Sequence, residues 1–384
     1  MRSGAVLLVV LFVSMVVAII SLGVLSRASR QMACGDTVAE RLKLDYLAES
    51  GLVHAKTLLL NPQEVDTSPD GYWAGGDALQ ILQLQTSDDY YDLEVTRSAS
   101  GPTYRCTYDI ECQAYRQEGA ERILQSNLYA QLRLDPCIAY WAGDADTSLS
   151  ARATINGDVY CKANLTSSVV VNGDVFATTF TGSSTGQTYV PGTLQVAYPD
   201  ITIGYFSPTY RYGELSYWPE SLPAEDCNNP PPFEPDAGNP AGVVYRQGNL
   251  RLMGDVAIDG TLVVNGDLTI RGPGSTVITA SKNYPAVIVN GGLTVENGAT
   301  LTIDGLVCAH SMTVADDADG ITILGALFLR DTGINQDVSY SGDITITTAP
   351  MLSSVYLISA SAPDIRWSPA GGAFFKYIRR NATP

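Results

Sequence analysis

The most constraining feature of the chain is an uncharged, mostly apolar segment from Gly4 to Ser26. About 20 apolar residues in a helix cross the hydrocarbon core of a bilayer, so this segment is long enough to span a membrane once. The apolar core of a cleaved secretory signal is shorter, about 7–15 residues, and ends in a small-residue exit site. Ser26 and Arg27 do not supply such a site. A single-pass membrane anchor is therefore expected.

The next segment has the pattern of an amphipathic helix. Residues 27–60 contain no proline, and apolar residues recur there mostly in steps of three and four, as on one face of a helix. The positions assigned to this stripe are Val38, Leu42, Tyr46, Leu47, Ala48, Ala55, Leu58 and Leu59. Pro62 pushes Asn61 out of the helical backbone region. The sequence predicts one continuous rod over residues 1–61, made of a membrane span and a stem.

This start of the chain resembles the N-terminal module of minor type IV pilins and type II secretion pseudopilins. The resemblance rests on residues 2–8, Arg-Ser-Gly-Ala-Val-Leu-Leu, on the apolar run, and on residues 45–52, Asp-Tyr-Leu-Ala-Glu-Ser-Gly-Leu. It implies that a prepilin peptidase cuts after Gly4 and leaves Ala5 as the new N-terminus. Most major pilins carry an acidic residue at the fifth mature position, where this chain has Val9. The resemblance therefore favours a minor or tip subunit.

Residues 62–136 have the pattern of a small antiparallel β domain. A turn-rich stretch, 62–85, comes first, and the polar, glycine-containing loop 116–121 is typical of a hairpin connection. The strands are expected at 90–96, 103–115 and 122–134. A sheet packed on the stem helix is the simplest arrangement, and it agrees with the layout of pilin-like proteins.

Beyond residue 136, glycine-containing corners separate very short apolar pairs. In 254–270 the pairs recur every six residues, as Val256/Ile258, Leu262/Val264 and Leu268/Ile270. A hairpin meander is one interpretation, because Asn-Gly is also a strong hairpin signal. However, a meander usually needs strands of about five to six residues plus a turn, which exceeds the whole repeat. A right-handed parallel β-helix with three faces per coil fits better.

The domain boundaries follow from these patterns. The β-helix is expected over 137–350, with a Pro- and Tyr-rich loop at 187–245 that either covers one face or binds a ligand. Residues 351–384 are expected to form a cap or tail. The predicted fold class is mainly β with one long N-terminal α-helix, a small antiparallel sheet and then the β-helix. Blocks 155–160 and 262–268 resemble bactofilin-type polymer-forming β-helices.

The chain shows no pattern of a catalytic, cofactor-binding or metal-binding site, so we predict a protein that is not an enzyme and has no cofactor. It has two histidines, no Cys-x-x-Cys pair and no phosphate-binding loop. Acidic corners suit turn caps better than calcium ligands or catalytic acids; they comprise Asp144, Asp146, Asp316, Asp317 and Asp319. The net charge of −17 repels phosphate and argues against a nucleic-acid partner.

Seven cysteines are present, and Cys106 and Cys112 are close enough in sequence to meet across a bend. They are a candidate disulfide in an oxidising compartment, with buried free thiols as the alternative.

Together these features predict a structural subunit of a bacterial envelope filament or secretion apparatus. It would sit in the inner membrane with a single span, display its head in the periplasm or outside the cell, and pack on other pilin-like subunits through the stem. The head would serve adhesion or contact surface polysaccharide or protein cargo. The alternatives are a membrane-tethered bactofilin-like scaffold whose coils stack end to end and an envelope β-helix enzyme acting on polysaccharide.

Overall fold

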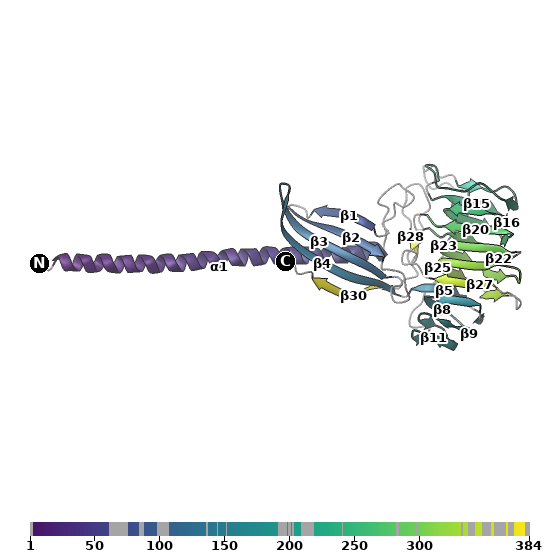
Figure 1. Cartoon of the computed structure of the whole chain (residues 1–384), viewed down its shortest axis with the longest axis horizontal. Helices are drawn as coiled ribbons and strands as arrows, with labels where there is room; N and C mark the ends of the chain where they lie inside the picture. The colour runs from purple at the N-terminus through teal and green to yellow at the C-terminus, as the bar shows by residue number, and fades with distance from the viewer. Residues whose placement is uncertain are drawn as a thin grey trace.

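The computed structural model describes residues 3–60, 76–83, 88–97, 107–135, 137–190 except 144 and 151, 198–208 except 199, 200 and 202, and 219–347 except 240, 282, 283, 297, 332 and 337–341, together with strands at 355–356, 366–367 and 372–380. Figure 1 shows a long rod that leads into a sheet and then into a stack of short strands. The predicted fold class, one long N-terminal helix followed by mostly β structure with parallel sheets, is confirmed.

The rod is one uninterrupted helix, α1 (Ser3–Leu60). Its N-terminal part extends alone from the rest of the molecule (Figure 1). The apolar side chains from Leu7 to Leu25 are exposed there. This helix is long and apolar enough to cross a membrane by its length and composition. The uncharged run and the absence of proline explain why the span and the stem form a single element.

The C-terminal half of α1 packs on a five-stranded antiparallel sheet of order β1-β2-β3-β4-β30. The three strands expected in this region are present as β2 (Asp89–Arg97), β3 (Thr107–Glu118) and β4 (Glu121–Asp135). Gly119 has a φ of 64° in the turn between β3 and β4, a conformation that glycine adopts at low cost. A further strand, β1 (Gly76–Gln83), lies in the stretch expected to contain only turns.

The fifth strand comes from the far end of the chain. β30 (Gly372–Arg380) pairs antiparallel with β4, from Gly372 opposite Asp135 to Arg380 opposite Leu128. The expectation that 351–384 forms a cap or tail is therefore wrong for this segment. β4 would otherwise be an open sheet edge, and β30 satisfies its backbone groups. The antiparallel domain is thus built from both ends of the chain, beyond the predicted range 62–136.

β28 (Val355–Tyr356) and β29 (Arg366–Trp367) pair antiparallel with each other. The other strands form parallel ladders that coil around a common interior, as in a parallel β-helix. The first ladder contains β13 (Glu220–Ser221), β15 (Val243–Gln247), β18 (Thr261–Asn265), β21 (Val287–Val289), the second halves of β23 (Ala299–Ala309) and β25 (Gly320–Leu329), β5 (Ile138–Ala142), β8 (Asp158–Cys161), β10 (Val175–Phe176) and β12 (Thr188–Tyr189). Consecutive members pair in register, one coil apart.

The other ladders have the same form. The second contains β17 (Val256–Asp259), β20 (Gly274–Thr279), the first halves of β23 and β25, β27 (Asp343–Thr347), β7 (Ala153–Asn156) and the ends of β9 (Asn164–Val171) and β11 (Thr179–Ser184). The third contains β14 (Asp226–Asn228), β16 (Leu250–Met253), β19 (Leu268–Arg271), β22 (Gly292–Glu296), β24 (Ser311–Val314) and β26 (Ile334–Gln336). β26 contacts β6 (Thr147–Leu149) without ladder pairing among the described residues, and β6 continues this face through the starts of β9 and β11.

The coils are not stacked in chain order. The last coils of the chain pair with the first, through β25 on β5 and β27 on β7. The chain therefore enters the stack part-way along it, builds outward to β12, and resumes at the opposite end with β13. It then builds back until it meets its own first coil. The coil that follows β4 and the coil that precedes β30 are neighbours in the stack. The stack is therefore an insertion between β4 and β30, which are adjacent strands of the sheet.

The loop predicted at 187–245 does not extend over this whole range, because β13, β14 and the start of β15 within it are strands of the coil stack. The described residues Tyr198, Ile201, Ile203 and Phe206 pack on the outward face of the first ladder. Tyr198 donates a hydrogen bond from its hydroxyl to the Ala309 carbonyl at 3.2 Å. Of the two expectations for this segment, packing over one face is therefore observed.

First-ladder strands inside the stack, such as β5 and β8, are buried on both sides, whereas the end strands β12 and β13 are exposed. In-register aromatic residues stack along the outward face, with ring centroids 5.7 Å apart for Trp141–Phe328 and 6.1 Å apart for Trp141–Tyr160. Second-ladder strands such as β17 instead alternate between buried and exposed side chains. At the corners, Gly260 has a φ of 145°, and a side chain there would meet the Gly242 carbonyl oxygen at 2.1 Å.

The expected disulfide between Cys106 and Cys112 is not formed. Cys112 is a buried free thiol, whereas Cys137 is disulfide-bonded, and Cys106 lies outside the described residues. Cys112 lies on the sheet face that packs against α1. Its side chain therefore packs in the helix–sheet interface and does not bridge a bend as predicted.

Candidate functional site

The helix–sheet interface is formed by one face of the stem. The buried stem residues are Leu44, Leu47, Ala48, Leu52 and Ala55. They pack on Leu93, Val95, Ile110, Cys112, Ala114, Leu128, Ala130 and Leu132 of β2, β3 and β4. The predicted stripe is therefore confirmed at Leu47, Ala48 and Ala55.

The prediction that Val38, Leu42 and Tyr46 share one helix face with these buried residues was wrong, because their side chains are exposed. Together with exposed Val53 they lie along one side of the helix, here called the outer stripe, which also carries exposed Glu49. At about 100° per residue, these four positions lie on the side of the helix opposite the buried set. The side chains of Leu58 and Leu59 lie outside the described residues.

Gly51 is the point of closest approach between α1 and the sheet. A Cβ atom at this position would lie 2.3 Å from the Cys112 Sγ and 3.1 Å from the Tyr91 ring. Both neighbours belong to or pack against the buried interface cluster. The lack of a side chain at Gly51 therefore lets the helix backbone sit directly on β2 and β3.

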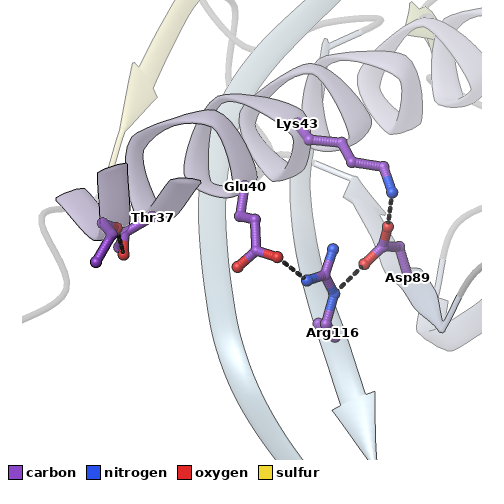
Figure 2. Close-up of polar contacts among 6 residues, drawn as sticks. Thr37, Glu40, Lys43, Asp89 and Arg116 are labelled. Carbon is purple, nitrogen blue, oxygen red and sulfur yellow. Dashed lines mark hydrogen bonds and ion pairs between the residues drawn. The ribbon is translucent and has the colours of Figure 1, made fainter. Parts of the chain in front are cut away.

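A charged cluster closes the interface beside this point (Figure 2). Asp89, at the start of β2, has a fully buried side chain. The Arg116 Nε lies 2.8 Å from Asp89 Oδ1, and Arg116 Nη1 lies 2.6 Å from Glu40 Oε1 on the helix. Lys43, one helical turn after Glu40, forms an ion pair with Asp89 Oδ2. The cluster joins the helix to two strands through alternating charges.

Asp89 is ionised in this setting. Burial opposes its ionisation, but the hydrogen bonds and charges of Arg116 and Lys43 outweigh burial and hold its pKa below the ordinary value of 3.8. Two further polar contacts tie the helix to the sheet. Ser126 donates to Asp45 Oδ1 at 2.5 Å, and the Tyr91 hydroxyl lies 3.0 Å from His54 Nδ1. Burial lowers the pKa of His54.

The other described residues that the sequence analysis singled out take part in helix, hydrogen-bond or ion-pair contacts. Gly4 and Ala5 lie in the first turns of α1. Asp146 Oδ1 accepts a hydrogen bond at 3.1 Å from the N–H of Asn164, which lies in the next coil, so Asp146 links two coils, while Asp144 lies outside the described residues. His310 pairs with Asp331 at 2.9 Å. Among the residues that the structure describes, no group of three or more His, Cys, Asp or Glu side chains is arranged to hold a metal ion.

Asp158, which sequence reasoning did not single out, links the sheet domain to the stack. Its two carboxylate oxygens accept hydrogen bonds from the N–H groups of Cys137 at 2.7 Å and Asp174 at 2.9 Å. Burial raises its pKa to about 6, although these two hydrogen bonds act in the opposite direction. An Asn-Gly-Asp corner, residues 156–158, is the sequence signal at this position.

Comparisons with known proteins give little further information. No protein-family model matches the chain, and no curated protein matches it. One solved structure found by structural similarity is the competence-associated pilin ComZ from Thermus thermophilus. The alignment covers 88% of this chain and 97% of that one, with 11% sequence identity and a TM-score of 0.29. These values do not establish a shared fold, so the functional argument rests on this chain's own residues.

We predict that Gly51→Leu destabilises the helix–sheet domain by about 1–3 kcal/mol, because the new side chain overpacks the interface at Cys112 and Tyr91. Gly35→Leu is the matched control, since nothing lies within 4 Å of a side chain added at Gly35. That change should stabilise the helix slightly through its helix propensity. Denaturant unfolding of the protein in detergent micelles measures both effects. Equal effects of the two substitutions would contradict the close approach at Gly51.

We predict that Asp89→Asn destabilises the protein by about 3 kcal/mol, because it leaves Arg116 and Lys43 without their buried partner. Asp92→Asn is the control and should cost less than about 1 kcal/mol, because the Asp92–Arg122 pair is partly solvated.

The pH dependence tests the same cluster. The stability that ionised Asp89 contributes is present above pH 3.8 and is lost as the pH falls through its lowered folded-state pKa. Asp89→Asn should therefore flatten the fall in unfolding midpoint between neutral pH and about pH 2. An unchanged acid profile in this variant would exclude Asp89 as the titrating group.

Proposed function

We propose that this protein is a membrane-anchored structural subunit of a bacterial envelope filament or secretion apparatus, similar to a minor pilin or pseudopilin. The observation that carries the proposal is the division of α1 into an exposed apolar half and a half seated on the antiparallel sheet. A helix held this firmly at one end presents its free half as an extended rod. Such a rod can reside in the inner membrane before assembly and among other stems afterwards.

The outer stripe supports packing on neighbouring stems. Val38, Leu42, Tyr46 and Val53 are each about half or more exposed and face away from the sheet. An apolar row on a helix that already has its own sheet-facing side is the kind of surface that a second helix covers. In this proposal, the partners are other pilin-like subunits, and the head lies in the periplasm or outside the cell.

The stack of coils would then be the displayed part of the subunit, for adhesion or for contact with polysaccharide or protein cargo. Its backbone groups are paired coil to coil, and its interior is filled with aliphatic side chains. Extensive pairing of this kind makes local opening costly, which suits an exposed envelope component. We propose no enzymatic activity for it.

We predict that Gly4→Leu blocks removal of the leader, because a peptidase that cuts after glycine must accommodate position 4 closely. Mass spectrometry of the protein from its native membrane should show a mature chain that begins at Ala5 in the parent and an unprocessed chain in the variant. Ser14→Leu, within the span, is the control and should be processed normally. An identical N-terminus in the parent and Gly4→Leu proteins would refute processing at this site.

We predict that Leu42→Asp removes the protein from the filament or secretion complex without unfolding its head, because it places a charge in the outer stripe. Thr37→Asp puts the same charge on an exposed position of the same helix, on the side opposite the stripe, and should be tolerated. The measurement is the fraction of protein that co-sediments with sheared filaments, alongside near-ultraviolet circular dichroism to monitor folding. Equal sedimentation of both variants would count against stem packing through this face.

A further inference from the structure

The two ends of the coil stack differ in a way that the proposed function does not explain. One end is formed by β13, β14 and the following residues near β15 and β16, and the other by β11 and β12 (Figure 1). An end coil has a ladder partner on one side, and its backbone N–H and C=O groups on the other side are available for pairing. Such an edge invites association unless it is blocked.

The first end is blocked by its sequence. Prolines at 219, 223, 230, 231, 232 and 235 run through it, and proline has no N–H to donate. The same stretch carries Glu220, Glu225, Asp226, Glu234 and Asp236. Glu225 and Asp226 pair with Arg251 of the next coil, and the other three carboxylates add negative charge to this end. Phe233 is buried there and forms a bridge to Ile258. Prolines and like charges are the features that natural proteins use to prevent edge pairing.

The second end lacks both features. The final coil, here called the open coil, comprises β11 and β12, from Thr179 to Tyr189. From Val175 to Val190 the sequence contains no charged residue and no proline, although the whole chain has a net charge of −17. Each open-coil strand pairs with the coil above it, β9 or β10. Among the described residues, no strand pairs with its other side.

The open coil also carries an apolar centre. Phe180 packs against the interior column and remains partly exposed, and its ring lies beneath Gly182. Tyr189 is 41% exposed at the first-ladder corner. The side chains of Thr179, Thr181, Ser183 and Thr188, in the same two strands, are exposed. The end surface therefore has an aromatic centre and exposed hydroxyl side chains, and among the described residues no strand pairs with its outer edge.

We infer that the open coil is the contact surface for a second copy of this chain, and that two copies join end to end through it as a closed dimer. Two molecules that are each strongly acidic repel one another least where both lack charge. The opposite end, with its prolines and carboxylates, does not offer the N–H groups that an added coil needs. Contact of open coil with open coil is self-complementary under a twofold axis and ends at two copies.

The test is the mass of the full chain in detergent micelles, measured by sedimentation equilibrium over a range of concentrations. The parent protein should sediment as a dimer, and Thr181→Lys with Ser183→Lys should sediment as a monomer, because like charges would face one another across the axis. Ser148→Lys is the matched control. Ser148 is an exposed serine two coils inward in the same ladder, since it pairs with Thr166, which pairs with Thr181.

A second control separates the two ends. Glu234→Lys, on the blocked end, should leave the dimer intact. A cysteine introduced by Thr181→Cys should give a covalent dimer on mild oxidation, above the background of the parent protein. A monomeric parent would overturn the inference. A dimer unaffected by the Thr181 and Ser183 lysines, as expected for association through the stem, would also overturn it. Species larger than dimers that Glu234→Lys abolishes would show that both ends are used.

This inference does not rest on the proposed filament role. Leu42→Asp tests stem packing in the filament fraction, whereas the open-coil lysines are tested by mass in micelles. Failure of either one leaves the other standing.

Discussion

The packing of the stem helix on the antiparallel sheet is the contact on which the rest of the structure depends. Gly51 brings the helix backbone against Cys112 and Tyr91, and the cluster of Glu40, Arg116, Asp89 and Lys43 closes the interface beside it. A buried carboxylate is tolerated because two cations and their hydrogen bonds offset its desolvation. Without this helix–sheet packing, the exposed apolar half of α1 would have no fixed direction relative to the head.

The sheet in turn determines how the coil stack is attached. Because β30 returns to pair with β4, the whole stack is held between two neighbouring strands rather than trailing from one. The stack meets this requirement by placing its first and last coils side by side, through β5 on β25 and β7 on β27. A long insertion with adjacent ends is compatible with a sheet that folds around it. Within the segment that crosses between the stack's two ends, Tyr198 and Phe206 pack on the first ladder.

That non-sequential order also creates the two unlike ends. If the coils had followed the chain, one end would have been the entry from β4 and the other the exit toward β30. Instead both ends are interior parts of the sequence, near 189 and 220. One is rich in proline and acid, and the other has neither. This asymmetry links the topology of the stack to the dimer inferred from it.

Residue patterns alone were sufficient for the long helix, the strands β2, β3 and β4, and the parallel coil, because each depends on local periodicity or on nearby turns. Six-residue spacing of Val256, Leu262 and Leu268 specifies coil geometry whatever lies above or below. The role of Asp89 was not foreseen, since its partners lie 27 and 46 positions away in the chain and nothing local distinguishes it from other surface acids. The same holds for Cys112, whose environment comes from α1.

Long-range pairing settled the remaining features. Which side of the stem is buried, that β30 completes the sheet, and that the last coils meet the first all depend on contacts between residues far apart in sequence. Many strands here have similar apolar pairs, so several stacking orders satisfy the same local pattern equally well. In the observed order, β30 completes the antiparallel sheet, the stack interior is filled and the aromatic face inside the stack is covered. These conditions depend on the folded chain as a whole.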